Sequence, residues 1–563
     1  MKNRKNPIII FISVLCLLFL AILLMQIILM NILPFQLALP LLGIFVLFTL
    51  IIVLWYNFTA RRPISRVFTA LLILILTGTY GLGNYYLYRT SRLLTEVTNL
   101  TDEVTHSVSI VTMKQNPFDS LESLNGNKIG ITPELDEEGT KRSMDDINQK
   151  IEYEAIEYSN YADELADLYE GSIAAIILND ANRSMIYDIE IYGHFSTQTK
   201  VLHETKWKTK RTTEVFAADP VNVTSEPFTV LITGNDSYGG LNENSRSDSN
   251  MLVTVNPNTH QVLMTSVPRD TYVEMACSAD AQDCPDGEKD KLTHSGLYGV
   301  GTTEQSLEQY FGTKINYYVR VNFSSLVNLV DALGGIDIEV GKGLAVESFR
   351  ANDELEGVHE GMNHLDGERA LAYSRERYAY EDGDAQRVKN QQQVLRAIIQ
   401  KMISPTMITN YGKFVDALSG SFETNMASDD LMSLIRYQLM LNPEWKFSSY
   451  GLSGSGDTQF CPTLGDAASV MILDEGSYET AINKINAVKD GKDPDKVEDL
   501  ATYSDIEQEV EEEAEQEEID TLQQSQDYSE YSTTEQYQTY SPSQPQEEIY
   551  YDPNTYVDSN YGY

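Results

Sequence analysis

Two stretches of the sequence concentrate arginines and aspartates at the ends of expected strands and helices. The first stretch, residues 228–272, contains Asp236, Arg246, Asp248 and Arg269. A sheet fold places its functional loops at strand ends, so these side chains are expected at one edge. Charges of both signs gathered there indicate an anion held by arginines together with a cation held by aspartates.

The second stretch, residues 371–391, adds Arg375, Arg377, Arg387 and Gln391. On an extended strand, Arg375 and Arg377 would lie on one face and repel each other unless an anion lay between them. Arg387 lies in the first turn of an expected helix, where the helix dipole favours anions. A phosphate bound at that terminus would resolve the mismatch. Gln391 is four residues further on and shares the same helical face.

This combination of side chains suits a Mg²⁺–pyrophosphate site. A guanidinium donates two parallel hydrogen bonds to a phosphate, and Mg²⁺ usually takes one or two carboxylates together with water and substrate phosphate. Taken singly, an arginine or aspartate at a strand end is most often part of a surface ion pair, which contributes about 0–1 kcal/mol. The sequence contains no His/Cys cluster with zinc spacing, no Walker loop and no GxSxG elbow.

The motifs around these residues resemble those of the LytR–CpsA–Psr family of cell-envelope proteins, over about residues 225–405. They read GNDS, SRSDSNMLVTV, SVPRDTYV and YSRER. The resemblance implies that Asp236 and Asp248 hold Mg²⁺. It adds Asp384, three residues before the helix arginine, and Lys291 in an Asp-Lys-Leu segment. The implied catalytic set is Arg246, Asp248, Arg269, Arg375, Arg377 and Asp384, and the implied polyprenyl-pyrophosphate-binding set is Arg246, Arg269, Lys291, Arg375, Arg377, Arg387 and Gln391.

The family reaction transfers a glycopolymer, with its phosphate, from a polyprenyl carrier to peptidoglycan. The resemblance therefore implies a Mg²⁺-dependent phosphotransferase of cell wall biogenesis. Its donor is a polyprenyl-pyrophosphate-linked teichoic acid or capsular polysaccharide, its acceptor is peptidoglycan, and it also contacts membrane lipid. Asp248 and Asp384 are the candidates for the general base. Two alternatives remain open: a polyprenyl-pyrophosphate hydrolase with water as acceptor, and a non-catalytic regulator or scaffold of envelope assembly.

Composition divides the 563 residues into four expected regions. Residues 1–90 carry the cytoplasmic N-terminus and membrane helices, and residues 91–222 form a smaller α/β accessory module. Residues 223–487 form the catalytic region, an α/β (α+β) domain with a central mixed sheet flanked by helices. Residues 488–563 are acidic and rich in tyrosine and glutamine, and this composition predicts a disordered tail.

Within the accessory module, the pattern predicts strands at residues 107–113, 127–131 and 172–178. It also predicts an acidic helix over residues 153–169. The module contains no catalytic motif. A spacer is the simplest interpretation, and a module that binds a ligand or partner is the alternative.

Three apolar stretches near the N-terminus predict transmembrane helices, at residues 8–33, 37–55 and 67–88. Positive residues precede the first stretch and separate the second from the third, which orients both segments toward the cytoplasm. These residues are Lys2, Arg4, Lys5, Arg61, Arg62 and Arg66. The expected location is therefore the cell membrane, multi-pass, with everything after about residue 90 extracellular. The net charge of −42 argues against nucleic-acid binding.

The cysteines follow from this location. Cys277 and Cys284 flank a polar loop on the oxidising side of the membrane, where disulfides persist. They are predicted to form a disulfide, whereas two free thiols are the alternative. Cys16 lies in the first apolar stretch, and Cys461 has no expected partner.

Overall fold

The protein is described by a computed structural model that covers most of the chain up to residue 500. The described residues are 7–30, 35–59, 62–98, 103–189, 192, 195–210, 220–235, 244–279, 281–350, 352–380, 383–404, 414 and 422–500. Contacts between Cα atoms divide the chain into two units, Met1–Tyr503 and Ser504–Tyr563. The second unit, which contains most of the predicted tail, lies outside the described residues.

The N-terminal region forms the helices α1 (Pro7–Leu29), α2 (Phe35–Leu54) and α3 (Pro63–Thr98). Within the described residues, two segments are long and apolar enough to cross a membrane, Ile10–Leu29 and Pro63–Leu93. The prediction of three such helices is therefore corrected to two on this criterion. The intermediate apolar stretch, Leu42–Phe58, is shorter than the roughly 20 residues that a span requires.

The second helix nevertheless packs against the other two. The Thr49 hydroxyl lies 2.6 Å from the Tyr80 hydroxyl on α3, and Asn57 donates a 2.9 Å hydrogen bond to Ser13 on α1. Buried Cys16, Ile52 and Ile73, one from each helix, belong to one apolar cluster. All three helices therefore share one core.

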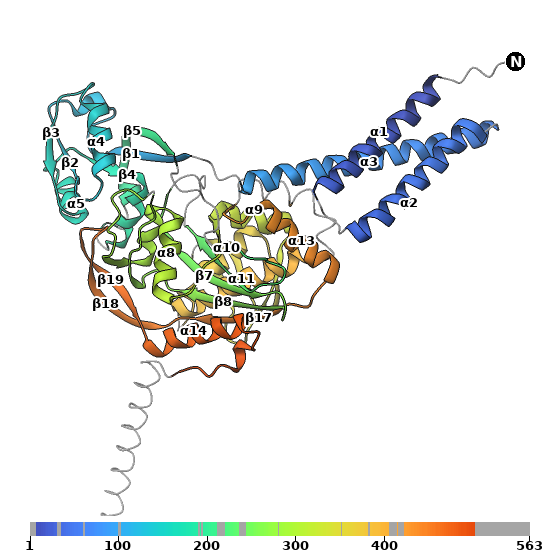
Figure 1. The fold of residues 1–563 in the computed structure, drawn as a ribbon. Coiled ribbons are helices and arrows are strands. Elements are labelled where there is room, and N and C mark those ends of the chain that lie inside the picture. Colours follow the sequence, from blue (N-terminus) through green and yellow to red (C-terminus); the bar gives the residue numbers. More distant parts are fainter. Residues whose placement is uncertain are drawn as a thin grey trace, which may run out of the picture. The chain divides into compact units, whose positions relative to one another are not determined.

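The accessory module is built on a mixed sheet with the order β3-β2-β4-β1-β5. Its strands β2, β3 and β4 are parallel, and β1 pairs antiparallel with both β4 and β5. The bounds of its elements are β1 (Glu103–Met113), β2 (Lys128–Ile131), α4 (Glu137–Ile147), β3 (Glu154–Glu157), α5 (Tyr161–Glu170), β4 (Ala175–Asn179), α6 (Phe195–Gln198) and β5 (Thr199–Lys210). Figure 1 shows this α/β module in cyan and teal.

One predicted helix of the module is shorter in the structure. Residues 153–169 were expected to be helical throughout, but their first part forms strand β3 and the helix begins only at Tyr161. The Asn160 side chain accepts a hydrogen bond from the Asp163 amide and caps that helix. Asparagine is a favoured N-cap, so the cap explains why the helix begins here.

The main domain contains the central mixed sheet that the sequence predicts. Its order is β16-β11-β6-β7-β8-β17, with antiparallel pairs at its centre and parallel pairs on either side. The apolar runs of the first stretch form β6, β7 and β8. The strands are β6 (Phe228–Gly234), β7 (Ser249–Asn256), β8 (Gln261–Val267), β11 (Tyr317–Val321), β16 (Glu423–Thr424) and β17 (Lys446–Gly451).

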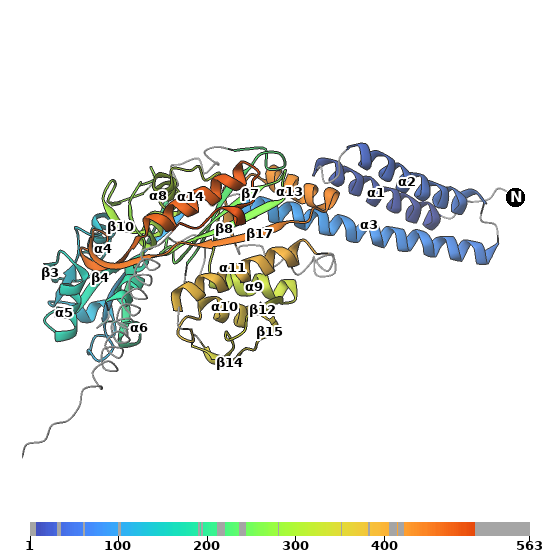
Figure 2. The same ribbon diagram turned by 90° about the horizontal axis from the view of Figure 1, so that it is seen from below.

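Helices cover both faces of this sheet, as Figure 2 shows. On one face, α8 (Val300–Phe311) and α14 (Glu475–Lys489) share an apolar cluster with Leu231, Leu252 and Leu263 of the sheet. The other face carries α9 (Phe323–Leu333), α10 (Gly367–Arg375) and α11 (Gly383–Met402). The result is a layered α/β domain.

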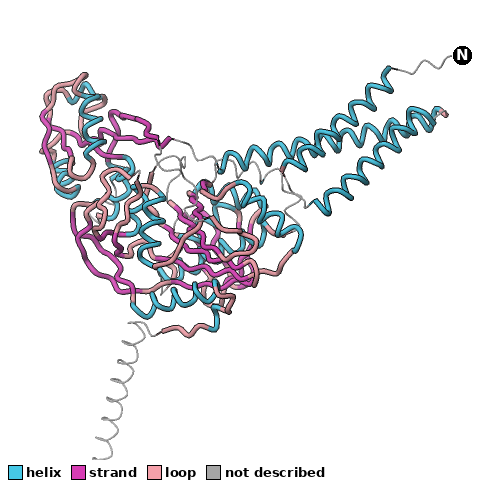
Figure 3. Tube along the Cα trace, viewed as in Figure 1, coloured by secondary structure: helices cyan, strands magenta, loops and turns pink. Residues whose placement is uncertain are grey.

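The remaining strands pair in two-stranded sheets outside the central sheet, and Figure 3 distinguishes helices, strands and loops along the chain. The long hairpin β18 (Gly454–Cys461) and β19 (Asp466–Leu473) extends from the main domain. The other elements are β9 (Tyr272–Glu274), β10 (Lys289–Lys291), α7 (Leu292–Ser295), β12 (Ile336–Val340), β13 (Val346–Phe349), β14 (Asn352–Val358), β15 (Gly361–Leu365) and α13 (Ser428–Leu441). Cys277 and Cys284 are joined, which confirms the predicted disulfide.

Candidate active site

A cavity of about 460 Å³ lies where β6 and β7 meet the helices α9, α10 and α11. Its lining combines charged side chains with apolar ones. The polar lining residues include Asn235, Asp248, Arg269, Arg350, Arg375, Arg377, Arg387 and Gln391, and the apolar ones include Ile232, Met251, Phe323, Leu326, Val394, Leu395 and Ile398.

Helix α11 gives the cavity a direction. Arg387 and Gln391 line it from the first turns, and Val394 and Ile398 line it from the turns that follow. At 1.5 Å per residue, the stretch from Arg387 to Ile398 spans about 16 Å. Along this axis the lining changes from cationic and polar to apolar. The cavity therefore fits a ligand with an anionic head and a hydrocarbon tail.

Arg375 and Arg377 reach the cavity from a helix end rather than from a strand. The predicted extended strand over residues 371–377 is wrong, because α10 runs through Arg375. The Asp366 side chain caps this helix by accepting a 2.9 Å hydrogen bond from the Arg369 amide. Both arginines nevertheless line the same cavity.

The arginines on this side are held in place by aromatic rings and by one buried carboxylate. The guanidinium carbon of Arg375 lies 4.4 Å from the centroid of the Phe323 ring, and Arg377 donates a 2.6 Å hydrogen bond to the Tyr378 hydroxyl. Glu376, which is almost fully buried, accepts hydrogen bonds from the amides of Arg350 and Arg377 at 2.7 and 3.1 Å. These contacts orient the cations toward the cavity before any ligand binds.

The potential in this part of the site is positive. The pKa of the Tyr378 phenol is lowered, first by its hydrogen bond from Arg377 and then by the charges of Arg377, Arg350 and Arg387. Because a lowered pKa means that the anionic phenolate is favoured, the same surroundings favour other anions.

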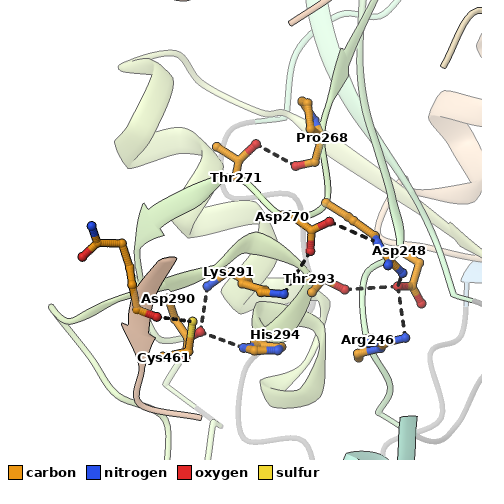
Figure 4. A network of polar contacts seen from close by, with 12 residues as sticks. Arg246, Asp248, Pro268, Asp270, Thr271, Asp290, Lys291, Thr293, His294 and Cys461 are labelled. Atoms are coloured by element: carbon orange, nitrogen blue, oxygen red, sulfur yellow. Dashed lines mark hydrogen bonds and ion pairs between the residues drawn. The ribbon is translucent and has the colours of Figure 1, made fainter. Parts of the chain in front are cut away.

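Asp248 lies at the centre of the second group of charges (Figure 4). Its Oδ1 accepts hydrogen bonds from Arg269 Nη1 at 3.0 Å and from the Thr293 hydroxyl at 3.3 Å. Nη2 of Arg246 lies 3.6 Å from the same oxygen. Arg269 and Asp248 line the cavity, whereas Arg246 is only 4% exposed and lines a separate small cavity of about 10 Å³. Arg246 therefore supports the site from behind the carboxylate.

Lys291 also lies behind the site. Its ammonium group is 3.3 Å from Asp270, whose other carboxylate oxygen is 3.5 Å from Arg269 Nε (Figure 4). Lys291 lines a different cavity, of about 200 Å³, together with His294. Its predicted role in direct pyrophosphate binding is therefore not supported by its position. Its link to the site is its contact with Asp270, which in turn contacts Arg269.

The structure brings six of the predicted residues into one lining: Asp248, Arg269, Arg375, Arg377, Arg387 and Gln391. Asp236 lies outside the described residues, although its neighbour Asn235 lines the cavity. Asp384 belongs to helix α11, and its side chain lies outside the description. Arg246 and Lys291 stand behind the lining.

The described part of the site offers oxygen ligands to a cation. The ion prefers oxygen ligands and usually takes one or two carboxylates from the protein. Asp248 presents a carboxylate at the cavity, and Asn235 lies in the same lining. The residues that could hold the ion are Asp248 and Asp236.

Three contributors to the site were not found from the sequence. Arg350 lies between β13 and β14, outside any motif, and reaches the cavity only through the fold. Phe323 lies outside any motif, and Glu376 lies inside the YSRER motif without a predicted role of its own. The one signal for Glu376 was its position between Arg375 and Arg377, where a carboxylate can hold the loop.

Asp290, His294 and Cys461 form a buried trio whose ligand atoms lie within 4.8 Å of one another. Burial raises the pKa of the Cys461 thiol to about 12, and the carboxylate of Asp290 adds to this. Asp290 accepts hydrogen bonds from His294 Nδ1 at 2.7 Å and from the Thr463 amide at 2.9 Å. The trio is therefore held by internal hydrogen bonds, and its cysteine is a thiol near neutral pH.

The main domain is thus a layered α/β domain whose cavity is lined by arginines at one end and by apolar side chains at the other. The chain belongs to the LytR_cpsA_psr family, whose match spans residues 191–483, just over half of the chain. This confirms the resemblance that the motifs indicated.

Curated relatives carry a functional name. The chain is 31% identical over 245 residues to the polyisoprenyl-teichoic acid–peptidoglycan teichoic acid transferase TagU of Bacillus cereus, covering 43% of this chain and 75% of the relative. It is 34% identical over 230 residues to the TagU of Enterococcus faecalis, covering 40% and 71%. Among solved structures, protein gbs0355 from Streptococcus agalactiae matches with 27% identity and a TM-score of 0.41, covering 50% of this chain and 94% of that one.

Proposed function

We propose that this protein is a membrane-anchored phosphotransferase that moves an anionic glycopolymer from a polyprenyl pyrophosphate carrier to peptidoglycan. The observation that carries the proposal is the single cavity whose lining changes from arginines to apolar side chains along helix α11. A pyrophosphate head and a polyprenyl tail have the same order of polarity. The printed names of the TagU relatives, teichoic acid transferases, support the same substrate class.

The reaction is a displacement at phosphorus. The acceptor hydroxyl oxygen attacks the phosphorus next to the glycan, and the bond from that phosphorus to the bridging oxygen breaks. Polyprenyl phosphate leaves with the bridging oxygen and the electron pair of that bond. The hydroxyl proton passes to a carboxylate, for which Asp248 and Asp384 are the candidates.

The residues of the chain stabilise the charge that develops in this step. Arg375, Arg377 and Arg387 bind the pyrophosphate oxygens, so the leaving group departs with its charge already neutralised. Asp248 fixes Arg269 at the cavity, and its negative charge offsets the repulsion between the guanidinium groups of Arg269 and Arg246. Asp236 and Asp248 would hold Mg²⁺, which would supply further positive charge to the reacting phosphate. Catalysis then comes mainly from positioning and electrostatics.

The direct test uses the full chain in lipid nanodiscs with a labelled polyprenyl-pyrophosphate-linked glycan. With a peptidoglycan fragment as acceptor, we expect a glycan–phosphate–peptidoglycan product, detected by mass spectrometry. Release of glycan phosphate at the same rate without the acceptor would favour the hydrolase instead. No product in either reaction would support the scaffold.

The apolar end of the cavity makes a separate prediction. Replacing Leu326 by Asp should weaken binding of a long-chain donor by roughly 30-fold, because burying a leucine-sized group contributes about 2 kcal/mol. Affinity for inorganic pyrophosphate, measured by calorimetry, should stay unchanged. Leu344→Asp is the control, since Leu344 is also a partly buried leucine beside the same core but does not line the cavity. Equal losses in both variants would place the tail elsewhere.

The proposed function also requires the main domain on the outer side of the membrane. We propose that the basic residues before α1 and between α2 and α3 face the cytoplasm and that residues after 98 are extracellular. Alkaline phosphatase, which is active only outside, should be active when fused after residue 230 and inactive when fused after residue 60. If only α1 and α3 crossed the membrane, the junction after residue 60 would lie outside and the junction after residue 230 inside. Activity after residue 60 alone would therefore contradict this topology.

A further inference from the structure

The accessory module presents an edge where α/β sheets usually bind ligands. Its strands β2, β3 and β4 run parallel, so their carboxyl ends, at Ile131, Glu157 and Asn179, meet at one side of the sheet. Open α/β sheets bind ligands in the crevice outside these ends. In this chain the loops after β2 and β3 are in contact with another segment of the same chain.

That segment is the tip of the hairpin β18–β19, residues 462–465. Gly465 has a φ of +71°, and a Cβ built there would lie 2.5 Å from the Ser159 carbonyl oxygen and 3.0 Å from Leu135 of the module. Leu464 is almost fully buried and belongs to the same apolar cluster as Tyr161 and Leu165 of helix α5. The tip is therefore packed closely against the loops after β2 and β3 and against helix α5.

The same hairpin donates hydrogen bonds to two residues beside the cavity, Asp270 and Asp290. The Met471 amide donates a 2.8 Å hydrogen bond to the Asp270 carbonyl oxygen. The Thr463 amide donates a 2.9 Å hydrogen bond to Asp290, which is fully buried. Asp290 also accepts from the backbone amide of Lys291 at 2.7 Å. The hairpin thus positions both partners of the Lys291–Asp270 pair (Figure 4).

We propose that the accessory module clamps the tip of this hairpin and thereby positions Lys291, Asp270 and, through them, Arg269 at the cavity. The module is then a positioning element for the active site rather than a spacer. The proposal rests on the proposed function only in treating Arg269 as part of the pyrophosphate site. Thr463, which lies at the tip and also accepts a hydrogen bond from the Tyr298 hydroxyl at 2.9 Å, is the positioning residue closest to Asp290.

The physical basis is that Asp290 has no solvent to replace a lost donor. A buried carboxylate that loses a hydrogen bond must find another partner or move. Because Asp290 and Lys291 are adjacent, a shift of the tip is transmitted directly to the Lys291 backbone. Loosening the tip should therefore change the geometry of the Lys291–Asp270–Arg269 chain of charges.

Two glycines provide a matched pair for the test. Gly465→Ala places a methyl group 2.5 Å from a module carbonyl, whereas Gly126→Ala, at nearly the same φ of +76°, meets nothing within 4 Å. Both variants carry the same backbone strain, but only the first disturbs the clamp. Leu464→Asp, which puts a charge into the shared apolar cluster, is the stronger second variant.

The measurements are hydrogen exchange of residues 158–161 and 289–295 in the full chain, and affinity for inorganic pyrophosphate. Gly465→Ala and Leu464→Asp should raise exchange in both segments and weaken pyrophosphate binding by roughly 5-fold or more. Gly126→Ala should match the unmodified protein in the exchange of both segments and in its affinity for pyrophosphate. Failure of the unmodified protein to bind pyrophosphate would count against the proposed function, while the exchange data still decide on the clamp.

Three outcomes would overturn the proposal. Exchange at 158–161 could stay unchanged in both tip variants, which would show that the module does not hold the tip. It could rise there without any change at 289–295, which would leave the hairpin uncoupled from Lys291. It could rise in both segments with unchanged pyrophosphate affinity, which would separate the Lys291 segment from the site.

Discussion

Replacing Arg375 by Ala should lower the rate of polymer transfer by roughly one to two orders of magnitude or more. A charge-assisted hydrogen bond to a phosphate contributes about 1.5–3 kcal/mol, and each 1.4 kcal/mol changes the rate or affinity tenfold. Arg375 lines the cavity from the end of α10 and stacks on Phe323. Transfer kinetics with a labelled donor measure the effect, and the same loss is expected for Arg377→Ala.

The matched control is Arg396→Ala. Arg396 also lies over an aromatic ring, that of Phe447 at 5.6 Å, but it is exposed and does not line the cavity. Its loss removes one positive charge and one cation–π contact without touching the site. Arg375→Lys should recover only part of the activity, because an ammonium lacks the planar two-point geometry of a guanidinium. Near-normal transfer by Arg375→Ala, with equal small losses of stability in both alanine variants, would mean that Arg375 is only a surface cation.

Much of the central sheet could be predicted because its signals are local. The strands at residues 228–234, 249–256 and 261–267 are apolar runs bounded by turns, and the turn at Asn256-Pro257 separates the last two. Two strands that are joined by a short turn usually pair antiparallel, and β7 and β8 do so.

The wrong predictions concern segments whose structure depends on residues outside them. Leu371 and Tyr373 alternate with small residues as in a strand, but the helix that contains them is set by the Asp366 cap further upstream. Likewise, α2 is helical as expected, yet the apolar helical stretch Leu42–Phe58 is shorter than a membrane span requires. Local alternation is a weak guide where a cap or a break lies a few residues away.

The residue types at the site could be predicted from the sequence, but which side chains line the cavity and which lie behind it could not. Residue types and motifs indicated which arginines would gather, and the cavity contains Arg269, Arg375, Arg377 and Arg387. Whether a side chain faces the cavity or stands behind it depends on tertiary packing. Arg246 therefore could not be distinguished from Arg269 by sequence, and Arg350, which no motif marks, could not be found.

Asp248→Ala should lower both the transfer rate and its dependence on Mg²⁺. In the structure this carboxylate is shared by Arg269, Arg246 and Thr293. Removing one partner of a buried charged group typically costs about 3–5 kcal/mol of stability, so the melting temperature should fall as well. A fall in stability alone would also reduce the measured rate, so a readout specific to the site is needed.

Inorganic pyrophosphate supplies that readout. In Asp248→Ala, Arg246 and Arg269 have lost their shared carboxylate, and an added anion takes its place. Since a ligand stabilises the folded state by an amount that grows with its affinity, pyrophosphate should raise the melting temperature of Asp248→Ala more than that of the unmodified protein. Asp337→Ala is the control, because Asp337 pairs with His364 and Lys401 at an exposed position away from the cavity. Equal shifts in Asp248→Ala and the unmodified protein, or full Mg²⁺-dependent transfer by Asp248→Ala, would remove Asp248 from the proposed metal and phosphate site.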